Sequence, residues 1–247
     1  FKMRGVHLCE PSPQRTPVIY QAGGSARGRA FAARHAECIF MSGLPKAQTR
    51  ERVREIRERA RAEGRDPSLI KFVMMATIVT GKTDAEAKDR YEMLSRCVDA
   101  EGMLALYSGF SGMDVSKELG QRTGNNGMEG VVEYLLKEDK SLERLRKIVT
   151  FGPQAGRECF LVGSPVRIAD ELQSWAEEAE IDGFNLHRSG EPQHLTDFVD
   201  LVVPELQNRK AYRQAYSDGT FRQKLFGKGD RIDAGHPAAR YRIPASD

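Results

Sequence analysis

The stretch that decides the fold is Pro17-Val18-Ile19-Tyr20-Gln21-Ala22-Gly23-Gly24-Ser25-Ala26-Arg27-Gly28-Arg29-Ala30-Phe31-Ala32. Residues 16–21 form a brief apolar, β-branched run between a proline and two glycines, which predicts a short buried strand. From Ala26 the apolar residues recur at helical spacing, so we expect a helix over about 25–36. The stretch therefore predicts a strand, a tight turn and a helix.

The turn between these elements is Ala22-Gly23-Gly24-Ser25. Adjacent glycines let the backbone bend sharply and approach a ligand, because no Cβ stands in the way. Ser25 is placed to cap the following helix, whose free N–H groups and positive dipole end suit a phosphate. The pattern is also typical of an ordinary capped corner that binds nothing, so from the residues alone both interpretations stay open.

Outward from this unit, strands alternate with helices. Further strands are predicted at 37–41, 70–79 and 182–186, and regular structure also returns at 160–163, where Ser164 and Pro165 begin a helix. Other helices are predicted at 45–64, 83–98 and 194–209. Four strand–helix units with buried strands predict a parallel α/β architecture. They are either half of an eight-stranded barrel or a small doubly wound sheet.

Two segments depart from the alternation. Between 100 and 160 lies an insertion whose apolar, glycine-interrupted run from Met103 to Met113 predicts a lid or binding loop, followed by a helical run at about 128–149. After Lys210 the chain is basic and aromatic without periodicity, which predicts an arm. We therefore divide the chain into a barrel part at 1–210, with 100–160 as its insertion or lid, and a C-terminal arm at 211–247.

Composition excludes several classes of protein. A chain of 247 residues with 40% apolar residues can bury one large core, and a net charge of +3 does not indicate a nucleic-acid partner. The arginines of the 45–64 helix alternate with glutamates, which favours a solvated outer helix over a basic patch. No apolar run approaches the ~20 residues of a membrane span. The chain opens on Phe1 instead of Met, so we expect that its native N-terminus is absent.

Cysteines and histidines show no metal-ligand spacing, so no metal site is predicted. The four cysteines are widely separated, which predicts reduced thiols and a cytoplasmic location. His187 follows a predicted strand at the end where βα folds place chemistry, although a structural role is the commoner one for a single histidine.

Several motifs together resemble one family. They are the run from Ser12 to Gly23, then Ser25-x-x-Gly28-x-x-Phe31-Ala32, and further segments at 36–40, 101–107, 182–186, 197–206 and 224–229. These resemble flavin-dependent monooxygenases of the bacterial-luciferase-like superfamily, in the branch of nitrilotriacetate monooxygenase component A, long-chain alkane monooxygenase and dimethyl-sulfide monooxygenase. The resemblance covers essentially the whole chain.

The resemblance implies a (β/α)8 TIM barrel, of which this chain would carry the C-terminal half, strands 5–8. It implies reduced FMN supplied by a separate NAD(P)H:flavin reductase, with the phosphate held at Ala22, Gly23, Gly24 and Ser25. A C4a-(hydro)peroxyflavin would insert one oxygen atom from O2 into the substrate. A homodimer or homotetramer is implied as well. Catalytic residues are left unassigned, because in these relatives the polar groups near the reactive carbon lie mostly in the other half.

The substrate is expected to be small and either apolar or sulfur-containing, and Leu106, Tyr107 and Phe110 are assigned to its side of the site. The alkane-oxidising relatives carry a histidine where this chain has Leu106, and the sulfide-oxidising ones carry leucine. The opening segment and the 224–229 motif lean toward the alkane enzyme, so both substrates stay open. Two rival interpretations remain: an inactive fragment or non-catalytic interaction module, and a deazaflavin-dependent oxidoreductase of the same superfamily.

Overall fold

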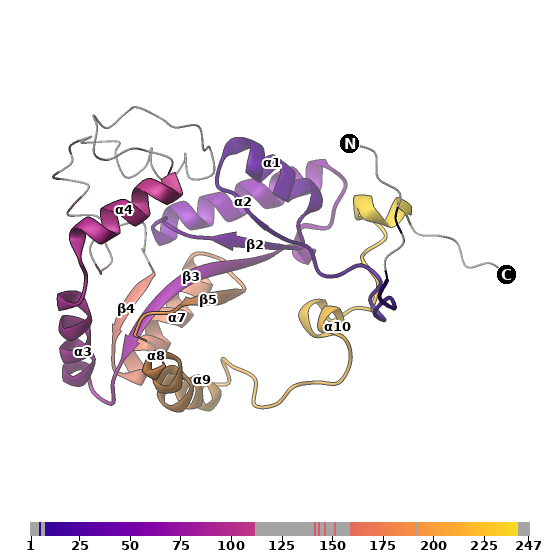
Figure 1. Ribbon diagram of the computed structural model, residues 1–247. Coiled ribbons are helices and arrows are strands. Elements are labelled where there is room, and N and C mark those ends of the chain that lie inside the picture. Colours follow the sequence, from indigo (N-terminus) through magenta and orange to yellow (C-terminus); the bar gives the residue numbers. More distant parts are fainter. Residues whose placement is uncertain are drawn as a thin grey trace.

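The computed structural model describes residues 5, 8–111, 141, 143, 146, 151, 159–190 and 192–241, and it is built around a parallel sheet (Figure 1). The described strands are β1 (Tyr20–Ala22), β2 (Cys38–Met41), β3 (Lys71–Thr80), β4 (Phe160–Gly163) and β5 (Gly183–His187). All of their pairings are parallel. The predicted parallel α/β architecture is therefore confirmed.

The long strand β3 organises the sheet, because it pairs with three others. Val73 and Met74 pair with β2 and also with β5, so these two strands lie on opposite edges of β3. Thr77 pairs with both β4 and β5, which puts β4 on the same edge as β2, farther along the strand. With β1 beside β2, the strands β1, β2, β3 and β5 follow one another in chain order across the sheet.

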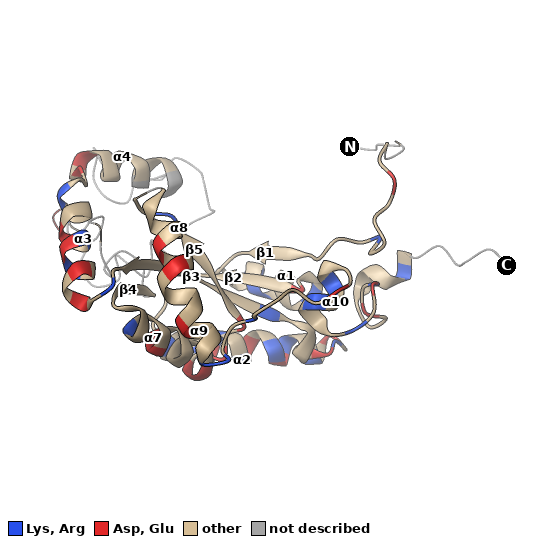
Figure 2. Cartoon of the chain, turned by 90° about the horizontal axis from the view of Figure 1, so that it is seen from below, with Lys and Arg blue, Asp and Glu red and all other residues tan. Residues whose placement is uncertain are grey.

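Helices connect the strands. The described α-helices are α1 (Ala26–His35), α2 (Lys46–Ala62), α3 (Asp84–Arg96), α4 (Ala100–Ser111), α7 (Pro165–Glu178), α8 (Gln193–Asp197), α9 (Val203–Asn208) and α10 (Phe221–Phe226). A π-helix (Phe198–Val202) joins α8 to α9, and 3-10 turns lie at Pro67–Leu69 and Pro237–Tyr241. Seen nearly edge-on, the strands have α2, α7 and α9 along one side, and α4 on the other side at one end (Figure 2).

The core lies between the sheet and those helices. One face of β3 contributes Phe72, Met74, Ala76 and Ile78, all at most 1% exposed. The apolar seam of α2 packs on this face, and so does the stripe of α7 that contains Trp175. Each of these helices has apolar residues at helical spacing on one side only, so one side of each is buried.

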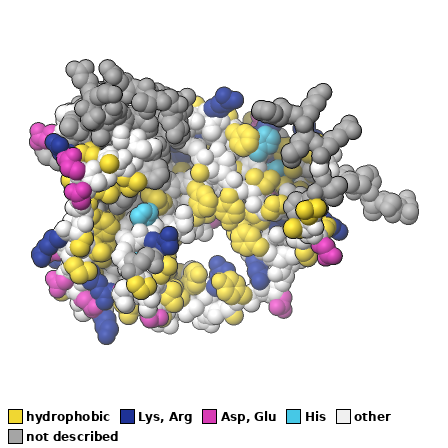
Figure 3. Space-filling view, viewed as in Figure 1, with side chains coloured by type: hydrophobic (Ala, Val, Ile, Leu, Met, Phe, Trp, Pro, Cys, Tyr) yellow, Lys and Arg dark blue, Asp and Glu magenta, His cyan; other side chains and the backbone are white. Residues whose placement is uncertain are grey.

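The opposite face of the sheet has far less cover. Because side chains alternate along a strand, it presents Tyr20, Phe40, Val73 and Met75. Tyr20 and Phe40 stack with ring centroids 5.2 Å apart and remain about two-fifths exposed. Figure 3 shows hydrophobic side chains gathered in the middle of this face. We call these four residues the uncovered face.

Sequential strand order and one covered face distinguish the two predicted architectures. A doubly wound sheet reverses its strand order and carries helices on both faces. Strands added in one direction with right-handed connections instead bring their helices to a single face, as in a barrel. Among the described strands, β1 pairs only with β2 and β5 only with β3. The arrangement therefore matches an arc of a barrel and not a doubly wound sheet.

Some predicted boundaries were wrong. The first strand begins at Tyr20 and not at residue 16, because the preceding backbone is held by the C-terminal arm instead of by a strand. Residues 160–163 form a fifth strand, paired with the end of β3. The predicted helix at 194–209 is interrupted by the π-helix just before Pro204, which has no N–H to continue the regular ladder.

The predicted lid loop also differs, since residues 100–111 form the helix α4. The Asp99 carboxylate accepts a hydrogen bond from Gly102 N at 2.7 Å, which caps this helix. Of the run from Met103 to Met113, the residues beyond 111 lie outside the described ones, as does nearly all of the helix expected at 128–149.

The C-terminal arm is fastened at the amino ends of the strands. Arg222 of α10 is 2% exposed and forms an ion pair with Glu37, the residue before β2. One Arg222 nitrogen lies 3.0 Å from a Glu37 oxygen, and the same nitrogen donates to the carbonyls of Thr16 and Pro17. The arm thereby joins the chain that enters β1 to the chain that enters β2.

We expect Arg222→Ala to lower the free energy of unfolding by about 3–5 kcal/mol, because it leaves the Glu37 carboxylate buried without its partner. Urea unfolding followed by circular dichroism measures this loss. Lys88→Ala is the control, since its ion pair with Glu92 is exposed. Equal losses in the two variants would contradict the role given to the buried pair.

Candidate functional site

The Ala22–Ser25 turn lies where β1 ends and α1 begins, at the carboxyl end of the sheet. Ala22 is the last residue of β1, and Ser25 is the N-cap of α1. The Ser25 hydroxyl accepts a hydrogen bond from Gly28 N at 3.1 Å, and the Ser25 carbonyl accepts from Arg29 N. The capping role predicted for Ser25 is confirmed. The earlier N–H groups of the helix are left pointing outward from its N-terminus.

Gly28 allows this turn to pack tightly. A Cβ at position 28 would lie 3.0 Å from the Gly23 carbonyl oxygen and 3.2 Å from Ser25 Oγ, closer than side chains normally approach. At Gly24 the nearest atom would be 3.6 Å away, an ordinary contact, and no positive φ is required there. The first turn of α1 is therefore pressed against the loop at Gly28, whereas Gly24 is open on its Cβ side.

Two arginines converge on the loop from outside. The Gly24 carbonyl accepts hydrogen bonds from Arg29 at 2.6 Å and from Arg52 of α2 at 3.3 Å. Arg29 also pairs with Glu55 at 3.0 Å. Burial and the neighbouring positive charge of Arg29 lower the pKa of Arg52. The sequence did not reveal this contact, because Arg52 is 28 residues from Gly24 and shares a helix with many other arginines.

The donor set of this loop fits a phosphate group. It offers outward N–H groups at a helix N-terminus and a serine hydroxyl, and two guanidinium groups, one from α1 and one from α2, lie against the Gly24 carbonyl. Helix N-termini with glycine-rich approaches bind anions for this reason. The four residues predicted for phosphate, Ala22 to Ser25, lie together at the carboxyl end of β1 and the N-terminus of α1. Their binding role stays a prediction.

The residues predicted to face the substrate lie on α4, beyond the carboxyl ends of the strands (Figure 1). Leu106 is 51% exposed, while Leu104 on the same helix is buried. Tyr107 and Phe110 belong to the same helix, but their side chains lie outside the described part of the structure. His187 is the last residue of β5, at the same end of the sheet, and is half-buried. Its role also stays a prediction.

The two buried cysteines are not suited to thiol chemistry. Burial raises the pKa of Cys38 to about 11 and that of Cys159 to about 12, so both thiols are protonated and unreactive at neutral pH.

The described residues contain no cluster of three or more metal-ligating side chains. Within the same ranges, no helix combines the length and the apolar character that crossing a bilayer requires.

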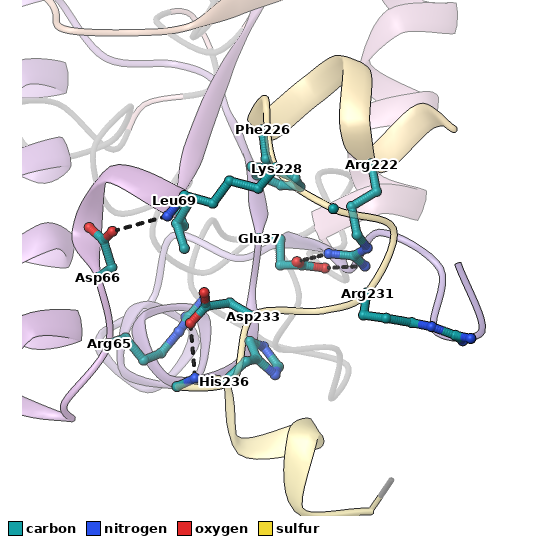
Figure 4. Close-up of a pocket in the computed structure, with 12 residues that line it drawn as sticks. Glu37, Arg65, Asp66, Leu69, Arg222, Phe226, Lys228, Arg231, Asp233 and His236 are labelled. Carbon is teal, nitrogen blue, oxygen red and sulfur yellow. Dashed lines mark hydrogen bonds and ion pairs between the residues drawn. The ribbon is translucent and has the colours of Figure 1, made fainter. Parts of the chain in front are cut away.

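A cavity of about 40 Å³ lies at the other end of the sheet (Figure 4). It is lined by charged residues that precede β2 and β3 and by the C-terminal arm. Figure 4 shows Arg222 and Glu37 facing each other, and Lys228 pointing toward Asp66. The Lys228 Nζ atom lies 3.8 Å from an Asp66 carboxylate oxygen. In barrel folds the residues at the amino ends of the strands usually contribute to stability, and the active site lies at the carboxyl ends. The cavity is therefore part of how the arm is fastened.

His236 closes this cavity in its neutral form. Its Nδ1 accepts a hydrogen bond from Ala238 N at 3.1 Å, so the proton is on Nε2, which donates to the His35 carbonyl at 2.9 Å. Burial, together with the positive charge of Arg65, lowers the pKa of His236. The sequence predicted that the arm lies over the domain or over a partner subunit, but it gave no sign of this role for His236.

Comparison with known proteins gives a consistent answer. Residues 1–182 match the family model described as luciferase-like monooxygenase. The long-chain alkane monooxygenase of Geobacillus thermodenitrificans is 44% identical over 100% of this chain and 53% of its own length. The dimethyl-sulfide monooxygenase of Hyphomicrobium sulfonivorans is 40% identical over 98% of this chain and 52% of its own length. The chain thus spans about half the length of these relatives.

A solved structure is similar over the same extent. The crystal structure of a riboflavin lyase, with modified FMN and riboflavin, superimposes with a TM-score of 0.78 at 32% identity, covering 98% of this chain and 55% of the other. The likeness therefore includes the strands, the covering helices and the arm.

We expect stability to fall as the pH is lowered from 7.5 to 5.5. The folded state disfavours protonated His236, so the unfolded chain binds more protons, and the stabilisation present above the ordinary histidine pKa is lost as the pH falls toward the lowered one. Urea midpoints at the two pH values measure the loss. His236→Gln removes the titrating group and should reduce the fall, with His35, whose pKa is also lowered, contributing the remainder. An unchanged fall in the variant would contradict this assignment.

Proposed function

Because the chain belongs to the luciferase-like monooxygenase family, we propose that its protein is a two-component monooxygenase that uses reduced FMN. It would insert one oxygen atom from O2 into a small apolar or sulfur-containing substrate. The observation that carries the proposal is the Ala22–Ser25 loop, whose donors and glycine packing fit a phosphate at the carboxyl end of the sheet. The fold is that of the luciferase-like barrels over about half of their length.

In this proposal the chain's own residues bind and orient the cofactor. Ser25 and the N-terminus of α1 would hold the phosphate, while Gly23 and Gly24 would let it approach the backbone. Reduced FMN, when bound, supplies the activation of O2. The protein then has to position the flavin and keep water from the reacting atoms.

Apolar surface near the carboxyl end supports the choice of substrate. The helix α4 presents Leu106, which is 51% exposed, beyond the carboxyl ends of the strands. Surfaces of this kind bind an apolar molecule by releasing water from both partners. An alkane-like or a dimethyl-sulfide-like substrate satisfies this requirement, and the named relatives include an enzyme for each.

Partners are proposed on the same basis. One relative is a nitrilotriacetate monooxygenase component A, which by its name is one part of a system with more than one component. This supports a separate flavin reductase as the source of the reduced cofactor. A homodimer or homotetramer and a cytoplasmic location stay predictions.

Flavin binding is the first test. We expect the purified full-length protein to bind FMN at least about tenfold more tightly than riboflavin, because each charge-assisted contact to the phosphate contributes about 1.5–3 kcal/mol. Gly28→Ala should reduce FMN affinity about tenfold by displacing the Gly23 carbonyl, and Gly183→Ala, where a Cβ meets nothing within 4 Å, should not. Quenching of flavin fluorescence measures these affinities.

The same measurement separates the rival interpretations. A preference for deazaflavin over FMN would favour the deazaflavin-dependent oxidoreductase. For the chain of 247 residues measured by itself, cooperative unfolding without flavin binding would favour the interaction module, and absence of both would favour the inactive fragment. In the full-length protein, a preference for deazaflavin or an absence of flavin binding would contradict the proposed monooxygenase.

Substrate contact is the second test, made with reduced FMN, O2 and a flavin reductase. We expect Leu106→Asp to raise KM for dimethyl sulfide or an alkane about fivefold, because a charge replaces about 1 kcal/mol of apolar contact. Met93→Asp on α3 is the matched control, since Met93 is also exposed and apolar. Equal effects of the two substitutions would remove Leu106 from the substrate side.

A further inference from the structure

We propose that Arg52 is a positioning residue of the phosphate loop, which holds the Gly24 carbonyl so that the N–H of Ser25 faces the bound phosphate. This inference rests on the proposed FMN site and deepens it. Arg52 belongs to α2, a helix outside the loop, and the residues that would touch the cofactor lie at the end of β1 and in the turn that leads to α1.

The first step of the argument is the geometry of one peptide group. Arg52 Nη1 lies 3.3 Å from the Gly24 oxygen, and Arg29 Nη1 lies 2.6 Å from the same atom. In a trans peptide the C=O and the following N–H point in opposite directions. Two guanidinium groups that hold the Gly24 oxygen on the α2 side therefore turn the Ser25 N–H away from α2. No protein acceptor is bonded to that N–H among the described residues.

The second step is the charge balance of the two arginines. Arg29 has a carboxylate partner, Glu55, at 3.0 Å. Among the described residues Arg52 has no ion pair of its own, because the nearby Glu55 carboxylate, which also acts on Arg52, is bonded to Arg29 and Arg59. The cluster therefore carries more positive than negative charge. A half-buried cation in this position has an unfavourable free energy that a bound dianion would offset. The cluster is thus suited to a state in which an anion is present.

Four other arginines of α2 contact carboxylates instead of the loop. Arg50, Arg54 and Arg57 all pair with Glu180, the residue that follows α7 and its C-cap. Arg59 pairs with Glu55. These contacts fasten the outer helix to its neighbours, which is the usual role of charged residues on such a face. Arg52 instead contacts a backbone oxygen of the loop, and a Cβ on Gly24 would lie 3.6 Å from its Nη1.

The test compares FMN with riboflavin, which lacks the phosphate, in the full-length protein and its variants. Arg52→Ala removes both the charge and the hydrogen bond to Gly24, whereas Arg52→Gln keeps a donor without the charge. Arg61→Ala is the matched control, because it removes the same charge from the same helix about 13 Å farther along its axis. Dissociation constants come from flavin fluorescence quenching, and thermal unfolding verifies that each variant is folded.

We expect Arg52→Ala to weaken FMN binding about tenfold and to leave riboflavin binding unchanged. Arg52→Gln should fall between the wild type and Arg52→Ala, and Arg61→Ala should match the wild type. If the wild type prefers FMN and Arg52→Ala keeps the whole preference, or if Arg61→Ala loses as much, the role of Arg52 is overturned while the FMN site stands. If the wild type shows no preference for FMN over riboflavin, the proposed function fails, and this inference fails with it.

Discussion

The order in which the strands join the sheet is the constraint on which the rest of the structure depends. β1, β2, β3 and β5 lie side by side in chain order and all run parallel. Right-handed connections then bring the helices to one face, and the other face receives little cover. The large apolar residues of β3 can therefore pack tightly against α2 and α7, while Tyr20 and Phe40 on the opposite face keep part of their surface exposed.

Because the strands are parallel, all their amino ends lie at one end of the sheet and all their carboxyl ends at the other, and the two ends carry different features. The amino ends are tied together by buried charge, with Arg222 of the arm on Glu37 and Arg65 donating to the carbonyls of Ala33 and Ala36. The carboxyl ends carry the glycine loop, α4 and His187. Stability and binding are thus assigned to opposite ends, so the loop can be adapted to a ligand without disturbing the fastening of the arm.

The link from fold to proposed function is the glycine loop and the family to which the chain belongs. A strand followed by two glycines and a helix capped by serine give N–H groups and a hydroxyl that suit an anion, with no histidine, carboxylate or thiol among residues 22–25. Such a loop is suited to binding an anionic group. This agrees with a family in which the flavin carries the reaction, and with a chain that spans about half the length of its relatives.

The sequence by itself determined the elements with strong local signals. The continuous apolar run of β3, the seam of α2 and the serine cap of α1 predicted their own structure, because periodicity and capping act within a few residues. Four predicted strand–helix units did not distinguish a barrel from a doubly wound sheet, because the two architectures differ in which strands pair with each other. The tertiary structure alone decided it, together with the pairing of residues 160–163 with β3 and of Arg222 with Glu37. The hydrogen bond from Arg52 to the Gly24 carbonyl was also visible only in the tertiary structure, because residues 28 apart in the chain have no local pattern that predicts their contact.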